Sequence, residues 1–281
     1  MADAALSTPL PATAPVRREG AMVRNLRAVL MVWVRDLIRL KRTPTRIVTG
    51  VAQPLLFLFV LGAGLSHLIG SQRAGGVNYQ QYLFPGILAM SVLTSSLFSA
   101  IAIVWDREFG FMREMLVAPV SRSTLVFGKA LGGGSVAVVQ GLILVFAAPI
   151  VGVSLTVGSF FAMVGFLLLL AFALTSFGIV VASRMQRMES FQMVMALVLQ
   201  PMIFLSGAIF PLVELPKWLA VVTRLNPATY GIDAIRRVLL PQIAPLTLFG
   251  WTVPLWADAV ITLAFGTAML TLAVRLFAQT E

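Results

Sequence analysis

The sequence predicts an all-α membrane protein with six transmembrane helices, and three observations support this fold class. First, 59% of the 281 residues are hydrophobic and only 11% are charged. The mean hydropathy of +0.94 is higher than a water-soluble domain can cover with polar surface. Second, apolar runs of about 20 residues, the length that crosses a bilayer, recur along the chain. Third, lysine and arginine gather in alternate connecting segments, as in cytoplasmic loops.

The apolar runs place the six expected spans at residues 47–65, 83–105, 131–153, 160–183, 191–210 and 256–276. We expect the third span to begin through the glycines at 132–134. With the amino terminus inside, the cytoplasmic segments hold sixteen of the 21 lysine and arginine residues and the outer segments hold five. Because cations near span ends stay on the cytoplasmic side, both termini are expected in the cytoplasm.

The residues before the first span divide into two parts. Residues 1–20 are rich in Ala, Pro, Ser and Thr without a hydrophobic run, which predicts a disordered tail. In residues 21–43, Leu26, Leu30, Trp33 and Leu37 recur at helical spacing, with arginines on the opposite face. This pattern predicts an amphipathic helix lying at the membrane interface, the alternative being an amphipathic helix packed on a soluble core. The six-span domain then covers residues 44–278.

The segment between the last two spans is cut by prolines into two short predicted helices, residues 216–225 and residues 226–239. The second opens with Asn226 as N-cap and Pro227 in the first turn. Both are too short to cross a bilayer. Broken helices at membrane depth need cover from protein or a water-filled cavity. We therefore expect a re-entrant helical hairpin on the outer face, and the alternative is a surface hairpin that only packs.

A mixed-charge segment lies between the second and third spans. From Arg107 to Ala118 only Gly110 opposes a helix, and Pro119 ends it. Phe111, Met115 and Ala118 give this helix one apolar face, and charged side chains occupy most of the rest. We expect a short cytoplasmic helix, and the alternative is a solvated loop.

Two sets of motifs resemble the permease subunits of type-2 ATP-binding-cassette exporters. The coupling segment of that family is matched by Arg107-Glu108, Glu114, Leu116-Val117, Pro119-Val120-Ser121-Arg122 and Gly128-Lys129. A second match covers the outer segment, with Ser206-Gly-Ala-Ile-Phe-Pro211 and Leu225-Asn-Pro-Ala-Thr-Tyr230. The chain is thus similar to the daunorubicin-export and nodulation-factor-export permeases of bacteria.

The resemblance implies how the chain works. The coupling helix would dock on a separate ATPase subunit and carry its motion into the membrane, through Arg107, Glu108, Phe111, Arg113, Glu114, Pro119 and Arg122. Two permeases, as a homodimer or as a heterodimer with a related permease, would assemble with two ATPases in the bacterial inner membrane. The outer hairpin would cap the complex through Pro211, Asn226, Pro227 and Tyr230.

The second and fifth spans supply the candidate translocation path. Ser91, Ser95 and Ser99 form a small polar face that lets helices approach closely. Met195 and Met202 add flexible thioether side chains, for which gap filling is the alternative role. Since the family uses these two spans at its dimer interface, we expect Ser95 and Met195 to face the dimer axis. Leu167 in the fourth span is expected to face lipid.

The chain contains few residues of the kinds that form catalytic or metal-binding sites. The chain has no cysteine and one histidine, His67, and no pair of carboxylates lies within a span. We therefore expect no catalytic residue, metal site or bound cofactor, and no nucleic-acid partner. Gly128-Lys129 lacks the glycine and the hydroxyl of a phosphate-binding loop, because Ser123 and Ala130 occupy those positions. ATP and magnesium would therefore bind the partner ATPase, and this chain alone would not be an enzyme.

The expected function is outward transport of a hydrophobic small molecule, drug or lipid-like substrate, driven by ATP. One alternative is export of a polysaccharide or lipo-oligosaccharide by the same fold, although few tyrosines and tryptophans are present to stack on sugars. A second alternative is an ion-gradient-driven secondary transporter, which would need intramembrane carboxylates or paired broken spans. A third is a membrane scaffold without transport.

Overall fold

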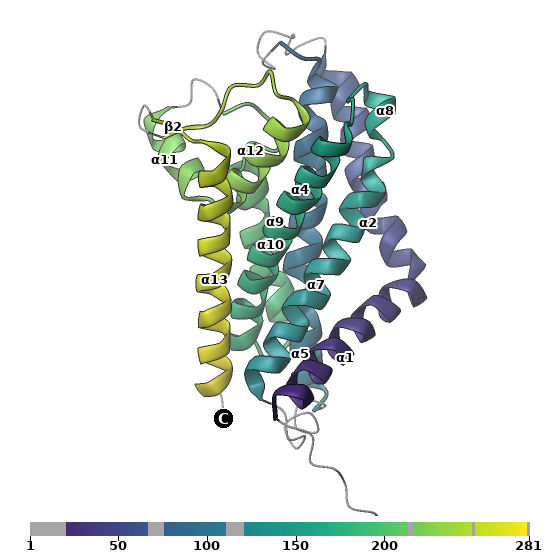
Figure 1. Ribbon diagram of the computed structural model, residues 1–281, viewed down its shortest axis with the longest axis vertical. Coiled ribbons are helices and arrows are strands. Elements are labelled where there is room, and N and C mark those ends of the chain that lie inside the picture. The colour runs from purple at the N-terminus through teal and green to yellow at the C-terminus, as the bar shows by residue number, and fades with distance from the viewer. Residues whose placement is uncertain (1–20, 67–75, 111–120, 213–215, 249–250, 280–281) are drawn as a thin grey trace, which may run out of the picture.

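The computed structural model describes residues 21–66, 76–110, 121–212, 216–248 and 251–279. These residues form a bundle of long helices with most of the short helices at one end (Figure 1). In chain order the elements are α1 (Ala21–Arg42), α2 (Pro44–Leu56), the π-helical turn η1 (Phe57–Leu61), α4 (Tyr79–Ser99), α5 (Ile101–Glu108), α7 (Arg122–Val145), α8 (Ala148–Val151), α9 (Val157–Arg184), α10 (Met188–Phe204), α11 (Lys217–Leu225), α12 (Pro227–Leu239), β1 (Thr247–Leu248), β2 (Trp251–Thr252) and α13 (Leu255–Gln279). The two strands form a small antiparallel pair.

Five helical segments of the described chain have the length and hydropathy to cross a bilayer. They are Ile47–Ser66, Tyr79–Glu108, Ser123–Val145, Val157–Arg184 and Leu255–Phe277. The predicted fifth span corresponds to α10, which has 17 residues and is about 25 Å long at 1.5 Å per residue. It ends earlier than predicted because the chain turns after Phe204, with Gly207 at a φ of 73°. The count of six crossings therefore stays a prediction.

The described ends of the chain, Ala21 and Gln279, lie at the same end of the bundle, close to the end of α5 (Figure 1). We call this the terminal end. Helices α11 and α12 lie at the opposite end, the hairpin end. This arrangement agrees with an even number of crossings.

Helix α7 corrects the predicted third span. It begins at Arg122, where the Ser121 side chain accepts a hydrogen bond from the Thr124 N–H at 3.4 Å. The glycines at 132–134 therefore lie well inside the helix, and the prediction that the span begins through them is wrong. They serve close packing, since a Cβ at Gly132 would meet the Asp36 side chain of α1 and one at Gly133 would meet Ser99 of α4.

The segment predicted as a helix from Arg107 to Ala118 begins differently in the structure. Arg107 and Glu108 form the last turn of α5, which continues the second span, and Gly110 follows with a φ of 82°. A helix starting at Arg107 is therefore wrong, because the apolar run of the span carries the helix through Glu108 and a left-handed glycine ends it. The remaining coupling residues and the histidine lie outside the described residues: His67, Phe111, Arg113, Glu114 and Pro119.

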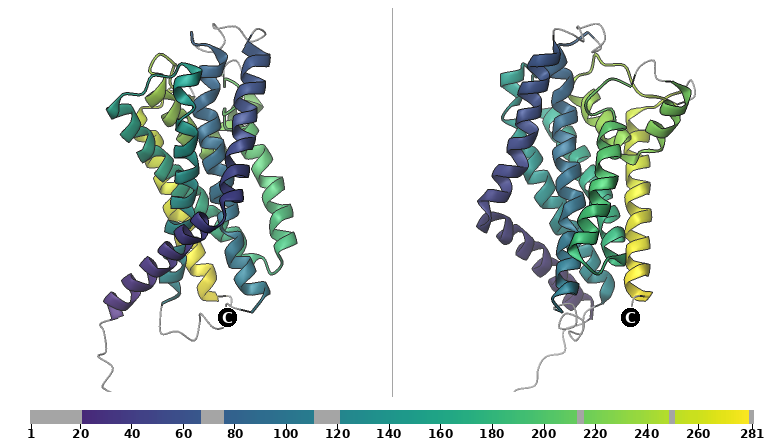
Figure 2. Two further views of the ribbon diagram at one scale, coloured as in Figure 1. Left: turned by 90° about the vertical axis from the view of Figure 1, so that its right-hand side faces the viewer. Right: turned by 180° about the vertical axis from the view of Figure 1, so that it is seen from behind.

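Helix α1 spans the predicted amphipathic segment and runs obliquely to the bundle axis across α7 (Figure 2). Trp33 Nε1 donates a hydrogen bond to Ser135 Oγ of α7 at 2.9 Å. Gly128 of α7 provides space for Val32 of α1. Leu26 and Leu30 stay exposed. The helix is confirmed, and its position at a membrane interface stays a prediction.

The two short helices before the last span have almost the predicted bounds. Pro216 is the N-cap of α11, and the Asn226 side chain accepts the Ala228 N–H at 3.1 Å at the start of α12. Helix α12 packs against α4, α9 and α13, and most of its residues are buried. A polar helix at the hairpin end is thus enclosed by long apolar helices.

Helix α9 occupies the centre of the bundle, where it contacts α4, α7, α12 and α13. Leu167 on this helix is fully buried. The prediction that Leu167 faces lipid is therefore wrong, because neighbouring helices cover that side of α9. The next residue, Leu168, is 49% exposed and lies on the uncovered side.

Candidate functional site

A cleft of about 440 Å³ lies between α2, α4, α7 and α10. Its hydrogen-bonding side chains are Thr49, Gln53, Ser91, Thr94, Ser95, Gln140 and Gln200. Apolar side chains form the rest of the wall, namely Pro54, Phe57, Met90, Phe98, Leu199, Ile203, Phe204 and Ile209. Gln53 of α2 and Gln200 of α10 are exposed, so the cleft opens to the outside of the chain between these two helices.

The side-chain hydroxyl groups of α4 that line the cleft differ in their hydrogen-bond partners. Ser91 Oγ donates to the Gly50 carbonyl of α2 at 3.5 Å, and Thr94 Oγ1 donates to the Met90 carbonyl of its own helix at 2.9 Å. Ser95 Oγ is buried and has no hydrogen-bond partner in the part of the chain that the structure describes. Because an unpaired buried hydroxyl is unfavourable, Ser95 is suited to bond a ligand in the cleft.

The cleft combines apolar walls with neutral hydroxyl and amide groups, and none of the described residues that line it is charged. Binding sites for small molecules commonly have such apolar walls with a few polar groups that fix orientation. A ligand that fits would carry apolar surface together with uncharged hydroxyl or amide groups. A strongly charged ligand would find no counter-charge among these lining residues.

The predicted path residues divide between the cleft and the core. Ser91 and Ser95 line the cleft. Ser99 does not line the cleft; its Oγ donates to the Ser96 carbonyl at 2.7 Å, and the residue packs beside Gly133. Met195 is fully buried in the core, and Met202 is half-buried.

Sequence reasoning missed the amide side chains of the cleft, Gln53, Gln140 and Gln200. A signal for them was present, because uncharged polar side chains inside apolar spans often mark substrate pathways. They come from three different helices, so local patterns did not bring them together.

Two side chains form hydrogen bonds with the backbone of the segment that follows α10 at the hairpin end. Tyr79 donates from its hydroxyl to the Ile209 carbonyl at 2.8 Å. Arg236 donates to the Gly207 carbonyl at 2.6 Å, and its guanidinium lies 4.1 Å from the centre of the Tyr82 ring. Helix α12 is therefore bonded to the end of the cleft helix α10 and stacked on α4.

The predicted outer-cap residues all lie near these contacts. Asn226 Nδ2 donates to the Met202 carbonyl of α10 at 2.8 Å. Tyr230 donates from its hydroxyl to the Arg224 carbonyl of α11 at 2.7 Å. Pro227 occupies the first turn of α12, and Pro211 is half-buried in the connection before α11. Their role as a cap stays a prediction.

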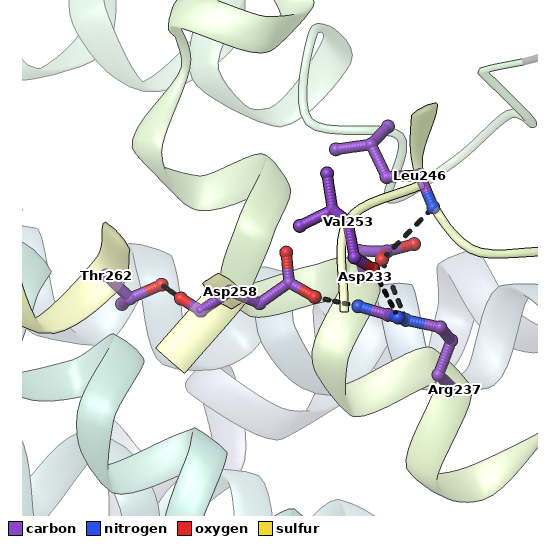
Figure 3. A network of polar contacts seen from close by, with 6 residues as sticks. All are labelled: Asp233, Arg237, Leu246, Val253, Asp258 and Thr262. Carbon is purple, nitrogen blue, oxygen red and sulfur yellow. Dashed lines mark hydrogen bonds and ion pairs between the residues drawn. The ribbon is translucent and has the colours of Figure 1, made fainter. Parts of the chain in front are cut away.

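A buried ionic network joins α12 to α13 (Figure 3). Arg237 pairs with Asp233 at 2.9 Å and with Asp258 of α13, and it donates to the Val253 carbonyl at 2.8 Å. Burial raises the pKa of the Asp233 carboxyl, while the guanidinium groups of Arg237 and Arg236 act in the opposite direction. The network thus fixes the hairpin to the last long helix.

The first two residues of the predicted coupling motif contact the turn between α9 and α10. Arg107 Nη1 donates to the carbonyls of Ser183 and Met185, both at 2.9 Å. Glu108 Oε2 accepts the Met188 N–H at 2.9 Å. Arg122 is the first residue of α7.

The Gly128-Lys129 pair is helical, and Lys129 Nζ pairs with Asp106 Oδ2 at 3.2 Å. The ion pair between Lys129 and Asp106 therefore joins α7 to α5.

Comparison with known proteins identifies the family. A family model described as ABC-2 type transporter matches residues 27–240. The chain belongs to the ABC-2 type transporter family. In this ABC-2 permease, the cleft positions from Thr49 to Ile209 and the coupling positions from Arg107 to Arg122 all fall within the matched range.

Named relatives agree with this assignment. The permease is 34% identical over 214 residues to a putative transport permease ycf38 of Cyanophora paradoxa, covering 74% of this chain and 72% of that protein. It is 33% identical over 229 residues to Nodulation protein J of Rhizobium leguminosarum bv. trifolii, covering 75% and 80%. With Nodulation protein J of Rhizobium meliloti the identity is 31% over 245 residues, covering 86% and 92%. The ABC-2 permease is thus a multi-pass membrane transport protein, as its sequence motifs predicted.

Proposed function

We propose that this permease is the membrane subunit of an ATP-driven exporter that moves a lipid-like amphiphile outward between two permease subunits. Separate ATPase subunits supply the energy, and ATP and magnesium bind there. The ABC-2 family assignment supports an ATPase partner. This chain therefore contributes the path and carries out no hydrolysis itself.

The neutral cleft between α2, α4 and α10 is the observation that carries the substrate proposal. Gln53, Ser95 and Gln200 offer hydrogen bonds without charge, while Phe57 and Ile203 offer apolar contact. An amphiphile with hydroxyl or amide groups on its head matches both kinds of surface. A lipo-oligosaccharide, the substrate of one alternative above, is one member of this class, and two of the relatives are named Nodulation protein J.

A purely hydrophobic drug is the second candidate. The aromatic and aliphatic side chains that line the cleft favour it, among them Met90, Phe98 and Phe204. It would displace water from the exposed amide groups of Gln53 and Gln200 without replacing the hydrogen bonds, which lowers its affinity relative to an amphiphile.

For the topology we propose six crossings, with α10 as the fifth, and the terminal end in the cytoplasm. The sixteen-to-five distribution of cations supports this orientation. The chain has no cysteine, so single cysteines report position without background. Gln186→Cys, in the exposed turn before α10, should resist an impermeant thiol reagent in intact cells, and Gln242→Cys, exposed after α12, should react. The reverse pattern of labelling contradicts the proposed orientation.

The transport test uses the permease co-purified with its ATPase and reconstituted in proteoliposomes. Candidate amphiphiles and apolar drugs are compared for stimulation of ATP hydrolysis and for ATP-dependent transport. Ser95→Leu fills the cleft and removes the free hydroxyl, so transport should fall strongly while the complex still assembles. Leu168→Ala on the exposed side of α9 is the control and should transport normally.

Three outcomes contradict parts of the proposal. Transport driven by an ion gradient without nucleotide rules out the ATP-driven exporter. Equal losses in Ser95→Leu and Leu168→Ala mean that packing, and not the cleft, is being measured. Stimulation by apolar drugs alone favours the second candidate substrate.

A further inference from the structure

The side chains of Arg107 and Glu108 hold the turn between α9 and α10 from both sides, and we call this pair the turn clamp. Arg107 donates to the Ser183 and Met185 carbonyls at the end of α9, with a third, longer contact of 3.4 Å to Ala182. Glu108 accepts the N–H of Met188, the first residue of α10. One end of α5 is thereby bonded to two other helices.

The charges of the turn clamp match the polarity of the backbone that they contact. The last carbonyls of a helix lack partners within the helix and carry a partial negative charge, which suits the guanidinium of Arg107. The first N–H groups of a helix carry a partial positive charge, which suits the carboxylate of Glu108. The order Arg-Glu along α5 therefore corresponds to the order of the two helix ends, α9 before α10.

One helix joined by the turn clamp, α10, lines the cleft, and another, α5, directly continues the cleft helix α4. Helix α5 follows α4 after only Ala100, and α4 contributes Ser91 and Ser95 to the cleft. Helix α10 contributes Gln200 and Phe204 to the opposite wall. The far end of α10 is also held, because Asn226 donates to the Met202 carbonyl. Helix α10 is therefore bonded to neighbouring elements near both of its own ends.

We propose that Arg107 and Glu108 are positioning residues that transmit movement of the coupling segment to α10. The segment follows directly after Glu108 in the sequence, so a displacement of the end of α5 pulls on the carbonyls of α9 and on the first N–H of α10. Movement of α10 then changes the width of the cleft. This inference rests on the proposed function, and it assigns the two residues to contacts within the permease where the family resemblance implied contact with the ATPase.

The test places an environment-sensitive fluorophore on Met193→Cys, an exposed position of α10 that does not line the cleft. The complex with a cysteine-free ATPase is measured in nanodiscs with and without ATP. In the otherwise unchanged permease we expect a spectral shift on addition of ATP. Arg107→Ala should abolish this shift and the transport, while the ATPase still co-purifies and hydrolyses ATP.

Glu108 provides a matched pair of variants. Glu108→Gln retains an oxygen that accepts the Met188 N–H and should retain the shift, whereas Glu108→Ala should reduce it. Asp106→Asn is the control for loss of a neighbouring charge, because Asp106 pairs with Lys129 of α7 and not with α10. If Arg107→Ala does not fold, the test uses the comparison of Glu108→Ala with Glu108→Gln. Both of these variants should fold, because Glu108 is exposed.

Several results overturn the inference. An unchanged shift in both alanine variants means that the turn clamp only caps helices. Loss of the ATPase from these variants assigns Arg107 and Glu108 to direct contact with it. Absence of a shift in a complex that transports normally shows that α10 does not move, whereas absence of transport in the unmodified permease contradicts the proposed function itself.

Discussion

Helices α2 and α12 form an instructive pair, because each has 13 residues and begins with proline, yet their environments are opposite. Helix α12 carries Asp233, Arg236 and Arg237, and most of its residues are buried. Helix α2 is mainly apolar, and Val48 and Leu56 are exposed by more than 60%. In a water-soluble protein the charged helix would be the exposed one.

The difference teaches what lies around each helix. An apolar face in contact with hydrocarbon needs no protein cover, whereas charged side chains and free helix ends at membrane depth need protein partners. Helix α12 finds those partners in α4, α9 and α13. The burial of charge and the exposure of apolar surface thus indicate a bundle whose sides face lipid.

The largest effect is expected from breaking the ionic network of α12. Asp258→Ala leaves Arg237 buried without one of its two carboxylates, and removing one partner of a buried pair costs about 3–5 kcal/mol. The thermal unfolding midpoint of the purified permease in nanodiscs measures this loss. Asp258→Asn keeps an oxygen that accepts a hydrogen bond and should lose less. Equal stability of Asp258→Ala and the unchanged protein contradicts the importance of the network.

A somewhat smaller effect is expected on the exposed side of α2. Leu56→Lys places a cation near the middle of the first span, where insertion costs about 2.5–3.5 kcal/mol. A glycosylation-based insertion assay of this span should show a reduced inserted fraction. Leu56→Met is the control and should insert normally. Normal insertion of the lysine variant would show that this side of α2 faces water.

The smallest effects on stability are expected from alanine substitutions at two helical glycines, Gly86 and Gly165. A Cβ at Gly86 of α4 would collide with the Ala208 backbone next to α12, whereas one at Gly165 of α9 would meet nothing within 4 Å. Gly86→Ala should destabilise the permease by about 1–3 kcal/mol through overpacking. Gly165→Ala should stabilise it by about 0.5–1 kcal/mol, the helix preference of alanine. Thermal unfolding compares the two, and equal changes would contradict close packing at Gly86.

Local signals in the sequence were sufficient for the helices of the hairpin end. Asn226-Pro227 fixes the start of α12 because an N-cap and a first-turn proline act within three residues. Apolar runs likewise located the long helices. The start of the coupling segment was placed incorrectly, because nothing local shows whether Arg107 opens a new helix or ends α5.

Contacts between distant residues could not be inferred from a single sequence. Arg237 and Asp258 are 21 residues apart, and Arg107 and Ser183 are 76 apart. Arg237 lies in the segment before the last predicted span and Asp258 lies near the start of that span, and no local pattern pairs them. The cleft also escaped detection as a unit, since Gln53, Gln140 and Gln200 come from three helices.

The pairing of Arg237 with Asp258 also sets an order for biogenesis. The ribosome makes α12 before α13, so Arg237 has only Asp233 as a counter-charge until the last helix is synthesised. The hairpin can complete its charge balance only after α13 has been inserted beside it. A nascent chain truncated before Leu255 would therefore present an incompletely neutralised arginine within the membrane protein, a feature that quality-control proteases can recognise.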